Sequence, residues 1–129
     1  MRKIENIVIH CTATPQSAKV SSIVRYWKDV LGWKNPGYHK IIDPEGCVQI
    51  LAPDSDVTNG VAGHNSRSLH VAYIGGEHTD DRTEAQKKSL HVVVNEWKQL
   101  YPDAKVLGHR DFPNVKKDCP NFDVSCEFP

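Results

Sequence analysis

Short apolar runs typical of β-strands alternate with stretches of helical periodicity along this 129-residue chain, and few folds accept that alternation. Strands are expected over Ile4–Ile9 and Leu69–Ile74, because each contains a continuous apolar run of strand length. Three further strands are expected at Tyr38–Ile42, Cys47–Leu51 and Ala104–Leu107. The sequence therefore predicts one α/β domain over residues 1–129, with a central mixed β-sheet of about five strands flanked by two or three α-helices.

Two amphipathic patterns predict the principal helices of this domain. The first consists of apolar side chains at helical spacing: Val20, Ile23, Val24, Trp27, Val30 and Leu31. Thr14 and Pro15 are expected to begin this helix as its N-cap and first-turn proline. The second helix is expected to start at a capping box formed by Thr83 and Gln86, and to stop before Pro102.

The composition argues against partners that require a strongly charged protein. Sixteen basic residues balance sixteen acidic ones, so the broad positive field typical of nucleic-acid binding is missing and no nucleic-acid partner is expected. No apolar stretch approaches the roughly 18–20 residues that span a bilayer, and the first residues lack a secretion signal. We therefore expect no membrane insertion and a cytoplasmic location as synthesised. The four cysteines are then expected to be thiols or metal ligands rather than disulfides.

Two histidines and a cysteine are candidates to meet at one end of the predicted sheet. His10 ends the first strand, His109 follows the last one, and Cys119 lies ten residues further on. Two imidazoles and a thiolate suit zinc, and three protein ligands leave the fourth tetrahedral position open for the water that hydrolysis requires. The residues alone leave a second interpretation open, in which hydrogen-bonded histidines end two strands and Cys119 is a small buried apolar residue.

Four longer motifs, spread over most of the chain, narrow the choice between these interpretations. They are IVIHCTATP, GWKNPGYHKIIDPEG, GHNSRSLHVAYIGG and GHRDFPNVKKDCPNFDV. In composition and order they are similar to motifs of the zinc-dependent N-acetylmuramoyl-L-alanine amidases of type 2. That family includes the phage lysozyme-like amidases and, more remotely, the peptidoglycan-recognition proteins. The resemblance extends from about Ile7 to Val124.

The resemblance implies a zinc ion held by His10, His109 and Cys119, with Tyr38 and Lys117 as catalytic residues. Zinc would lower the pKa of a bound water towards about 7 and so supply a nucleophile for the lactyl carbonyl between N-acetylmuramic acid and L-alanine. Lys117 would place a positive charge beside the developing oxyanion. The phenol of Tyr38 is a poor base at neutral pH, so we expect it to donate a hydrogen bond or orient the water, with general base as the alternative.

The long polar loop in the middle of the chain departs from the family pattern. Many members carry a histidine a few residues before the asparagine of this loop, and Gly60 stands at that place here. His64 is the candidate to replace this histidine in substrate binding, and Asn65 to hydrogen-bond the peptide stem, although both also suit the organisation of a turn. His70 lies within a predicted strand and is expected to be a packing or surface residue. Trp33 is a candidate to border the cleft.

The expected activity is hydrolysis of bacterial peptidoglycan by a phage or prophage-type lytic enzyme that acts on the cell wall after release. The alternatives are a non-catalytic peptidoglycan-binding module and a cytoplasmic amidase that recycles muropeptides. A purely structural zinc would need a fourth ligand, for which Asp111 and Cys126 are the candidates. By analogy with some phage amidases, RNA polymerase is a candidate regulatory partner. The protein is expected to be a monomer.

Overall fold

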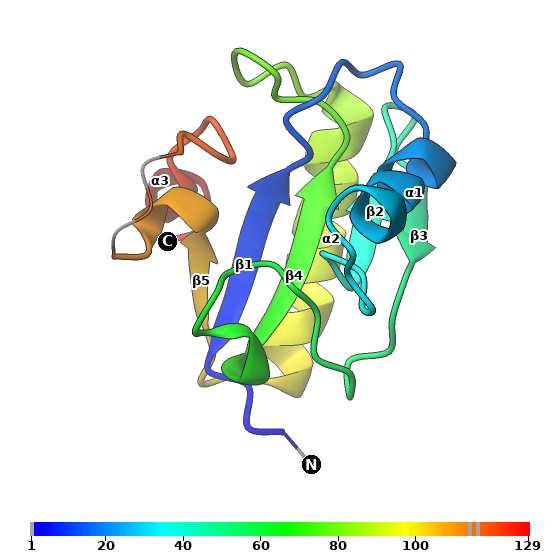
Figure 1. Ribbon diagram of the computed structural model, residues 1–129. Coiled ribbons are helices and arrows are strands. Elements are labelled where there is room, and N and C mark those ends of the chain that lie inside the picture. Colours follow the sequence, from blue (N-terminus) through cyan, green and yellow to red (C-terminus); the bar gives the residue numbers. More distant parts are fainter. Residues whose placement is uncertain (1, 114, 116) are drawn as a thin grey trace.

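Five strands and three α-helices form the protein in the computed structural model, which describes residues 2–113, 115 and 117–129 (Figure 1). The strands are β1 (Asn6–Cys11), β2 (Lys40–Ile42), β3 (Val48–Ile50), β4 (Ser68–Tyr73) and β5 (Lys105–Gly108). The helices are α1 (Val20–Asp29), α2 (Glu84–Leu100) and α3 (Val124–Glu127), and the 3-10 turns are Asn65–Arg67 and His109–Asp111. This architecture confirms the predicted α/β class.

The sheet has the strand order β3-β2-β4-β1-β5. β1 is parallel to both of its neighbours, β4 and β5. β2 is parallel to β4, and β3 pairs with β2 in the antiparallel sense at the edge of the sheet. Because parallel strands end at the same edge, the residues that follow β1, β4 and β5 gather there, which is where α/β proteins commonly bind ligands.

Different helices cover the two faces of the sheet. In Figure 1, α2 lies behind the sheet and α1 lies in front of it. Ile7 and Ile9 of β1 belong to a buried cluster that contains Leu90 and Trp97 of α2. Val8 belongs to a separate cluster, because successive side chains of a strand face opposite sides. The same alternation sends His10 to the face that α2 does not cover.

Helix α1 begins later than the sequence predicts. Its first residue is Val20, and its N-cap is Lys19, which makes no side-chain capping bond. The prediction that Thr14 and Pro15 start this helix is wrong, because Thr14 instead forms a β-bridge with Gly76 beyond the end of the sheet. Pairing with a distant segment therefore outweighs the local capping signal.

Helix α2 starts as the sequence predicts. The Thr83 hydroxyl accepts a hydrogen bond from the Gln86 N–H at 3.0 Å, and the Gln86 side chain accepts one from the Thr83 N–H at 3.0 Å. Gln86 also donates to the carbonyl oxygen of Ile74 at 2.9 Å, so the cap is tied to the end of β4. Within the described part of the chain, no helix combines the length and the apolarity that crossing a bilayer requires.

Candidate active site

Three candidate metal ligands converge at the edge where the parallel strands end. Ile9 of β1 pairs with Gly108, the last residue of β5, so His10 comes next on β1 and His109 follows directly after β5. Cys119 reaches the same place from the segment that follows the second 3-10 turn. One potential ligand atom from each of the three side chains lies within 4.8 Å of the others. This spacing fits a single ion held by two imidazoles and a thiolate.

The surroundings of the two histidines favour neutral imidazoles. Burial is the main reason why the pKa of His10 lies well below its ordinary value, and the neighbouring His70, His109 and Lys117 lower it further. Burial and the charge of Lys117 also lower the pKa of His109. Because metal binding requires an unprotonated ring nitrogen, both histidines are in the ligating form at neutral pH.

Two opposing effects act on the pKa of the Cys119 thiol. Contact with Cys11 and burial raise the pKa of this thiol above its ordinary value. The Cys11 N–H, however, donates a hydrogen bond to the Cys119 sulfur at 3.1 Å, and such a bond favours a thiolate once it forms. A cation beside the sulfur would offset the effect of burial by lowering the pKa of the thiol. Metal binding is therefore expected to release a proton from Cys119.

A cavity of about 160 Å³ opens beside the three candidate ligands. Its wall also contains Tyr38, Lys117 and Trp33. The Tyr38 ring centroid lies 5.0 Å from that of His10, and Lys117 is exposed to solvent on the cavity rim. The fold thus brings together all the residues that the sequence predicts to bind metal or to act in catalysis. Trp33 also borders the cavity, as expected.

The candidates for a fourth, closing ligand lie elsewhere. The Asp111 carboxylate accepts a hydrogen bond from the Gly108 N–H at 2.8 Å. Cys126 is exposed on α3, where its thiol lies 3.2 Å from the Asp123 carboxylate. Across residues 2–113, 115 and 117–129, the set of two histidines and Cys119 is the only group of three or more such side chains that lie close enough to hold a metal together. A metal held by these three side chains would therefore have its fourth position open to the cavity, an arrangement typical of catalytic rather than structural zinc sites.

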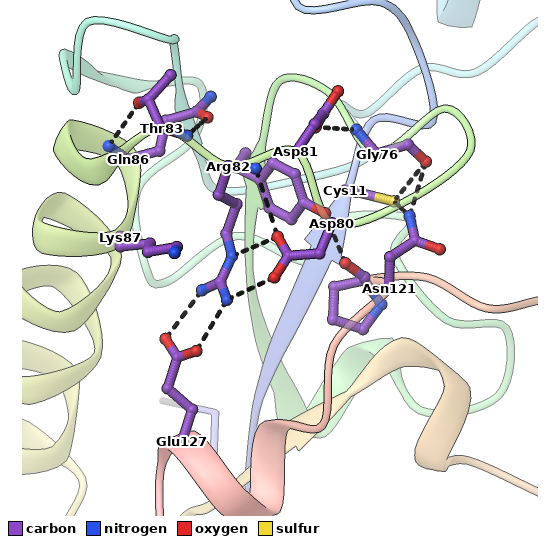
Figure 2. Close-up of polar contacts among 12 residues, drawn as sticks. Cys11, Gly76, Asp80, Asp81, Arg82, Thr83, Gln86, Lys87, Asn121 and Glu127 are labelled. Carbon is purple, nitrogen blue, oxygen red and sulfur yellow. Dashed lines mark hydrogen bonds and ion pairs between the residues drawn. The ribbon is translucent and has the colours of Figure 1, made fainter.

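The segment that carries Cys119 is tied to the ends of the central strands. The Tyr73 hydroxyl at the end of β4 donates to the carbonyl oxygen of Pro120 at 2.6 Å. The Asn121 side chain donates to the carbonyl oxygen of Gly76 at 2.7 Å, as Figure 2 shows. These bonds hold Cys119 against the strand ends and keep the distance between its sulfur and the two histidines short.

A buried arginine connects the segments around this support. The Arg82 side chain is 2% exposed and donates hydrogen bonds of 2.8–3.0 Å to Asp80 and Glu127. Its guanidinium also lies 3.5 Å from the centroid of the Phe122 ring. Figure 2 shows Arg82 between the two carboxylates, one on the loop after β4 and the other on α3. Arg82 therefore couples α3 to the chain that follows Cys119.

Replacing Glu127 by glutamine is expected to lower the free energy of unfolding at pH 7 by about 1.5–3 kcal/mol, the usual worth of hydrogen bonds to a charged group. Hydrogen bonds from Arg82 lower the pKa of Glu127 in the folded protein. The stabilisation that the Glu127 carboxylate provides is therefore complete above its unfolded pKa of about 4.3. It is lost as the pH falls through the lower pKa that Glu127 has in the folded protein. Urea unfolding at pH 7, 4.5 and 3 checks this. A difference between wild type and Glu127→Gln that stays constant over this range would contradict it.

The two predicted substrate contacts are not part of the cavity. His64 packs on Phe112, with ring centroids 4.7 Å apart, and borders a hollow at the opposite end of the sheet, where β1 and β5 begin. Asn65 points its Oδ1 inward, accepting a hydrogen bond from the Val61 N–H at 2.8 Å. The same oxygen lies 3.0 Å from Nε2 of His70. Both residues make contacts within the loop, in keeping with their turn chemistry, and their contact with substrate stays a prediction.

His70 lies beside the candidate metal ligands, although the sequence predicts a packing or surface residue at this position. It is fully buried in β4, and its Nδ1 lies 2.9 Å from Nε2 of His10. Burial is the main reason why the pKa of His70 is lowered to about 3, so the ring is neutral at pH 7. Val8 pairs with His70 in the parallel register, which places His70 and His10 on the same face of neighbouring strands. Strand alternation was the signal that could have found it.

The fold and the site together define a class of protein. It is a small α/β protein that brings two histidines and a cysteine to the ends of parallel strands, around a position that a metal could occupy beside an open cavity. Such a site suits metal-assisted attack by water on a bound substrate.

Comparisons with known proteins identify the family within this class. A family profile described as N-acetylmuramoyl-L-alanine amidase matches residues 1–122. The endolysin of Enterobacteria phage K11 is 34% identical over 122 residues, which cover 90% of this chain and 80% of that protein. An N-acetylmuramoyl-L-alanine amidase from Homo sapiens is 31% identical over 88% of this chain and 20% of its own length. The solved endolysin of the Thermus scotoductus MAT2119 bacteriophage Ph2119 shares the fold, with a TM-score of 0.86 at 23% identity, covering 98% of this chain and 83% of that one.

The chain therefore belongs to the N-acetylmuramoyl-L-alanine amidases of type 2. It is a phage-type peptidoglycan amidase, an enzyme that hydrolyses the amide bond between N-acetylmuramic acid and L-alanine.

Proposed function

We propose that this amidase is zinc-dependent, that His10, His109 and Cys119 bind one zinc ion, and that the enzyme lyses bacterial cell walls. The observation that carries the proposal is the convergence of three ligand atoms within 4.8 Å of one another beside an open cavity. Nitrogen and thiolate donors favour zinc over magnesium and calcium, which prefer oxygen ligands. Zinc held by such a set would supply Lewis acidity, which activates a water molecule and polarises a carbonyl at neutral pH.

Lys117 stabilises the negative charge that develops on the scissile carbonyl oxygen. The side chain stands on the cavity rim, where its charge already acts on the imidazoles and lowers the pKa of both His10 and His109. A carbonyl bound in the same cavity therefore lies within the field of this positive charge. Such stabilisation is strongest where bound substrate excludes water, so the contribution of Lys117 grows as the substrate fills the cavity.

Tyr38 acts as a hydrogen-bond donor rather than as a base. Burial raises the pKa of its hydroxyl well above the ordinary value, and the nearby Cys119 and Cys11 raise it further. The hydroxyl keeps its proton and donates a hydrogen bond to the carbonyl oxygen of Cys11 at 3.3 Å, a long bond that a better acceptor could replace. Substrate or water in the cavity is such an acceptor. Tyr38 would orient it by donating a hydrogen bond to it.

Lysis of intact wall, rather than recycling of soluble fragments, is favoured by the relatives of similar length. Endolysins of Enterobacteria phage K11 and Escherichia phage T7 are 34% and 32% identical, and the matches cover 80% and 81% of those proteins. In this setting the enzyme acts on the cell wall after release from the cell that makes it.

Digestion of purified peptidoglycan by the metal-loaded protein tests the proposal. We expect new L-alanine amino termini without new reducing sugars, one zinc per chain by elemental analysis, and loss of hydrolysis when a chelator removes the metal. New reducing ends would assign the enzyme to the glycosidases instead. Cleavage restricted to soluble muropeptides would favour recycling, and tight binding of wall without any cleavage would leave a binding module.

A further inference from the structure

We propose that His70 is a positioning residue that holds His10 in the tautomer whose Nδ1 lone pair is available to the metal. The inference rests on the proposed role of His10 as a metal ligand and extends it to a residue outside the ligand set. Its starting point is a chain of contacts that runs from the long loop through Asn65 and His70 to His10.

The direction of each hydrogen bond in this series of contacts follows from the first one, between Val61 and Asn65. The Val61 backbone N–H donates to Oδ1 of Asn65 at 2.8 Å, which identifies that atom as the amide oxygen. The same oxygen lies 3.0 Å from Nε2 of His70, and an oxygen of this kind can only accept. Nε2 of His70 therefore carries the proton, and Nδ1 of this neutral ring carries a lone pair.

The contact between His70 and His10 then determines which nitrogen of His10 carries the proton. Nδ1 of His70 lies 2.9 Å from Nε2 of His10, and because Nδ1 can only accept, Nε2 of His10 must donate. A neutral imidazole carries one proton, so the Nδ1 atom of His10 is left with its lone pair. Metal-ligating histidines commonly donate their other ring N–H to a neighbour, which sets the tautomer and the ring orientation. His70 is that neighbour here.

Gly60 is the second observation that supports this role. A Cβ atom built on Gly60 would lie 2.2 Å from Nδ1 of His70 and 2.4 Å from its Cε1, so any side chain at residue 60 would collide with the ring. The His70 imidazole thus occupies the space that a side chain at residue 60 would need. The loop therefore leaves room at Gly60 for the imidazole that β4 supplies.

The proposal predicts a tautomer that can be observed without any substitution. In long-range ¹H–¹⁵N spectra of the wild-type protein without metal, His10 and His70 are both expected to be protonated at Nε2 and unprotonated at Nδ1. On addition of zinc, the Nδ1 resonance of His10 is expected to shift while Nε2 keeps its proton. A His10 ring protonated at Nδ1, or zinc bound through Nε2 of His10, would overturn the proposal.

Substitution of His70 tests whether the contact matters for the metal. His70→Ala is expected to raise the zinc Kd, measured by competition with a chelator, by about 10–100-fold. His70→Asn, whose amide oxygen reaches about as far as Nδ1 of histidine, is expected to restore most of that loss. His78→Ala removes a histidine that is exposed on the loop after β4, outside the site, and serves as the matched control with unchanged zinc affinity. A zinc Kd for folded His70→Ala equal to that of the wild type would contradict the positioning role.

The contact with Gly60 provides an independent double-mutant cycle. Gly60→Ala is expected to raise the zinc Kd as His70→Ala does, because the added methyl group displaces the ring. Gly60→Ala in the His70→Ala background is expected to have no further effect, since the atoms it would meet are gone. Additive effects would count against the proposal. Failure of wild-type protein to bind zinc, or unchanged zinc affinity in His10→Ala, would instead refute the proposed ligand set on which it rests.

Discussion

Replacement of Cys119 by alanine is expected to abolish both zinc binding and hydrolysis of the wall. The substitution removes one of three side chains that together supply the ligand atoms within 4.8 Å of one another. Even neighbours that merely orient ligands change metal affinity by about 10–100-fold, so loss of a ligand should exceed about 100-fold. Elemental analysis after dialysis measures the zinc content, and release of L-alanine amino termini from peptidoglycan measures activity.

Cys47→Ala is the matched control for this experiment. Cys47 is an exposed free thiol just before β3, and it is not part of the ligand cluster. We expect one zinc per chain and full activity in this variant. We expect Cys119→Ala to fold, because a buried cysteine packs as a small apolar residue and alanine is similar to it. Circular dichroism of the variant checks this. Stoichiometric zinc in folded Cys119→Ala would show that a different set of residues holds the metal.

Two of the three candidate ligands could be placed from local signals in the sequence. His10 and His109 follow apolar runs that identify strands, and in parallel strands such positions meet at one edge. The observed ends differ by one or two residues from the predicted ones, since β1 extends to Cys11, but this does not separate the ligands. The resemblance to the amidases then favoured the metal-binding interpretation that includes Cys119, and it contributed Tyr38 and Lys117, which no spacing along the chain would have placed beside the candidate ligands.

The contacts that required the tertiary structure were harder to predict. His70 contacts His10 only because β4 pairs with β1 in one particular register, and sequence order does not reveal which strands are neighbours. The loop residues show the same limit. His64 and Asn65 are adjacent in the sequence, yet one borders a hollow at the far end of the sheet and the other supports His70. Thr14 likewise does not cap α1 as its local sequence predicts, but forms a β-bridge with the distant Gly76.

Replacement of Lys117 by methionine is expected to reduce kcat by about 10²–10³-fold while the bound zinc remains, because the positive charge acts on the oxyanion that develops in the transition state. Methionine keeps an unbranched side chain of similar length, so the exposed rim of the cavity retains its shape. The steady-state rate of L-alanine amino-terminus release gives kcat, and the zinc content is measured on the same preparation. Lys117→Arg preserves the charge and is expected to recover part of the rate.

Lys105→Met separates this local effect from a change in overall charge. Lys105 is exposed at the start of β5, at the end of the sheet opposite to the cavity, and its removal alters the net charge of the protein by the same amount. We expect its kcat to equal that of the wild type. If Lys117→Met lowered the rate only by losing zinc, Lys117 would be a support for the metal rather than a catalytic residue. If both methionine variants lost activity equally, attraction of the protein to the anionic wall would explain the effect, because such attraction depends on net charge rather than on the position of one lysine.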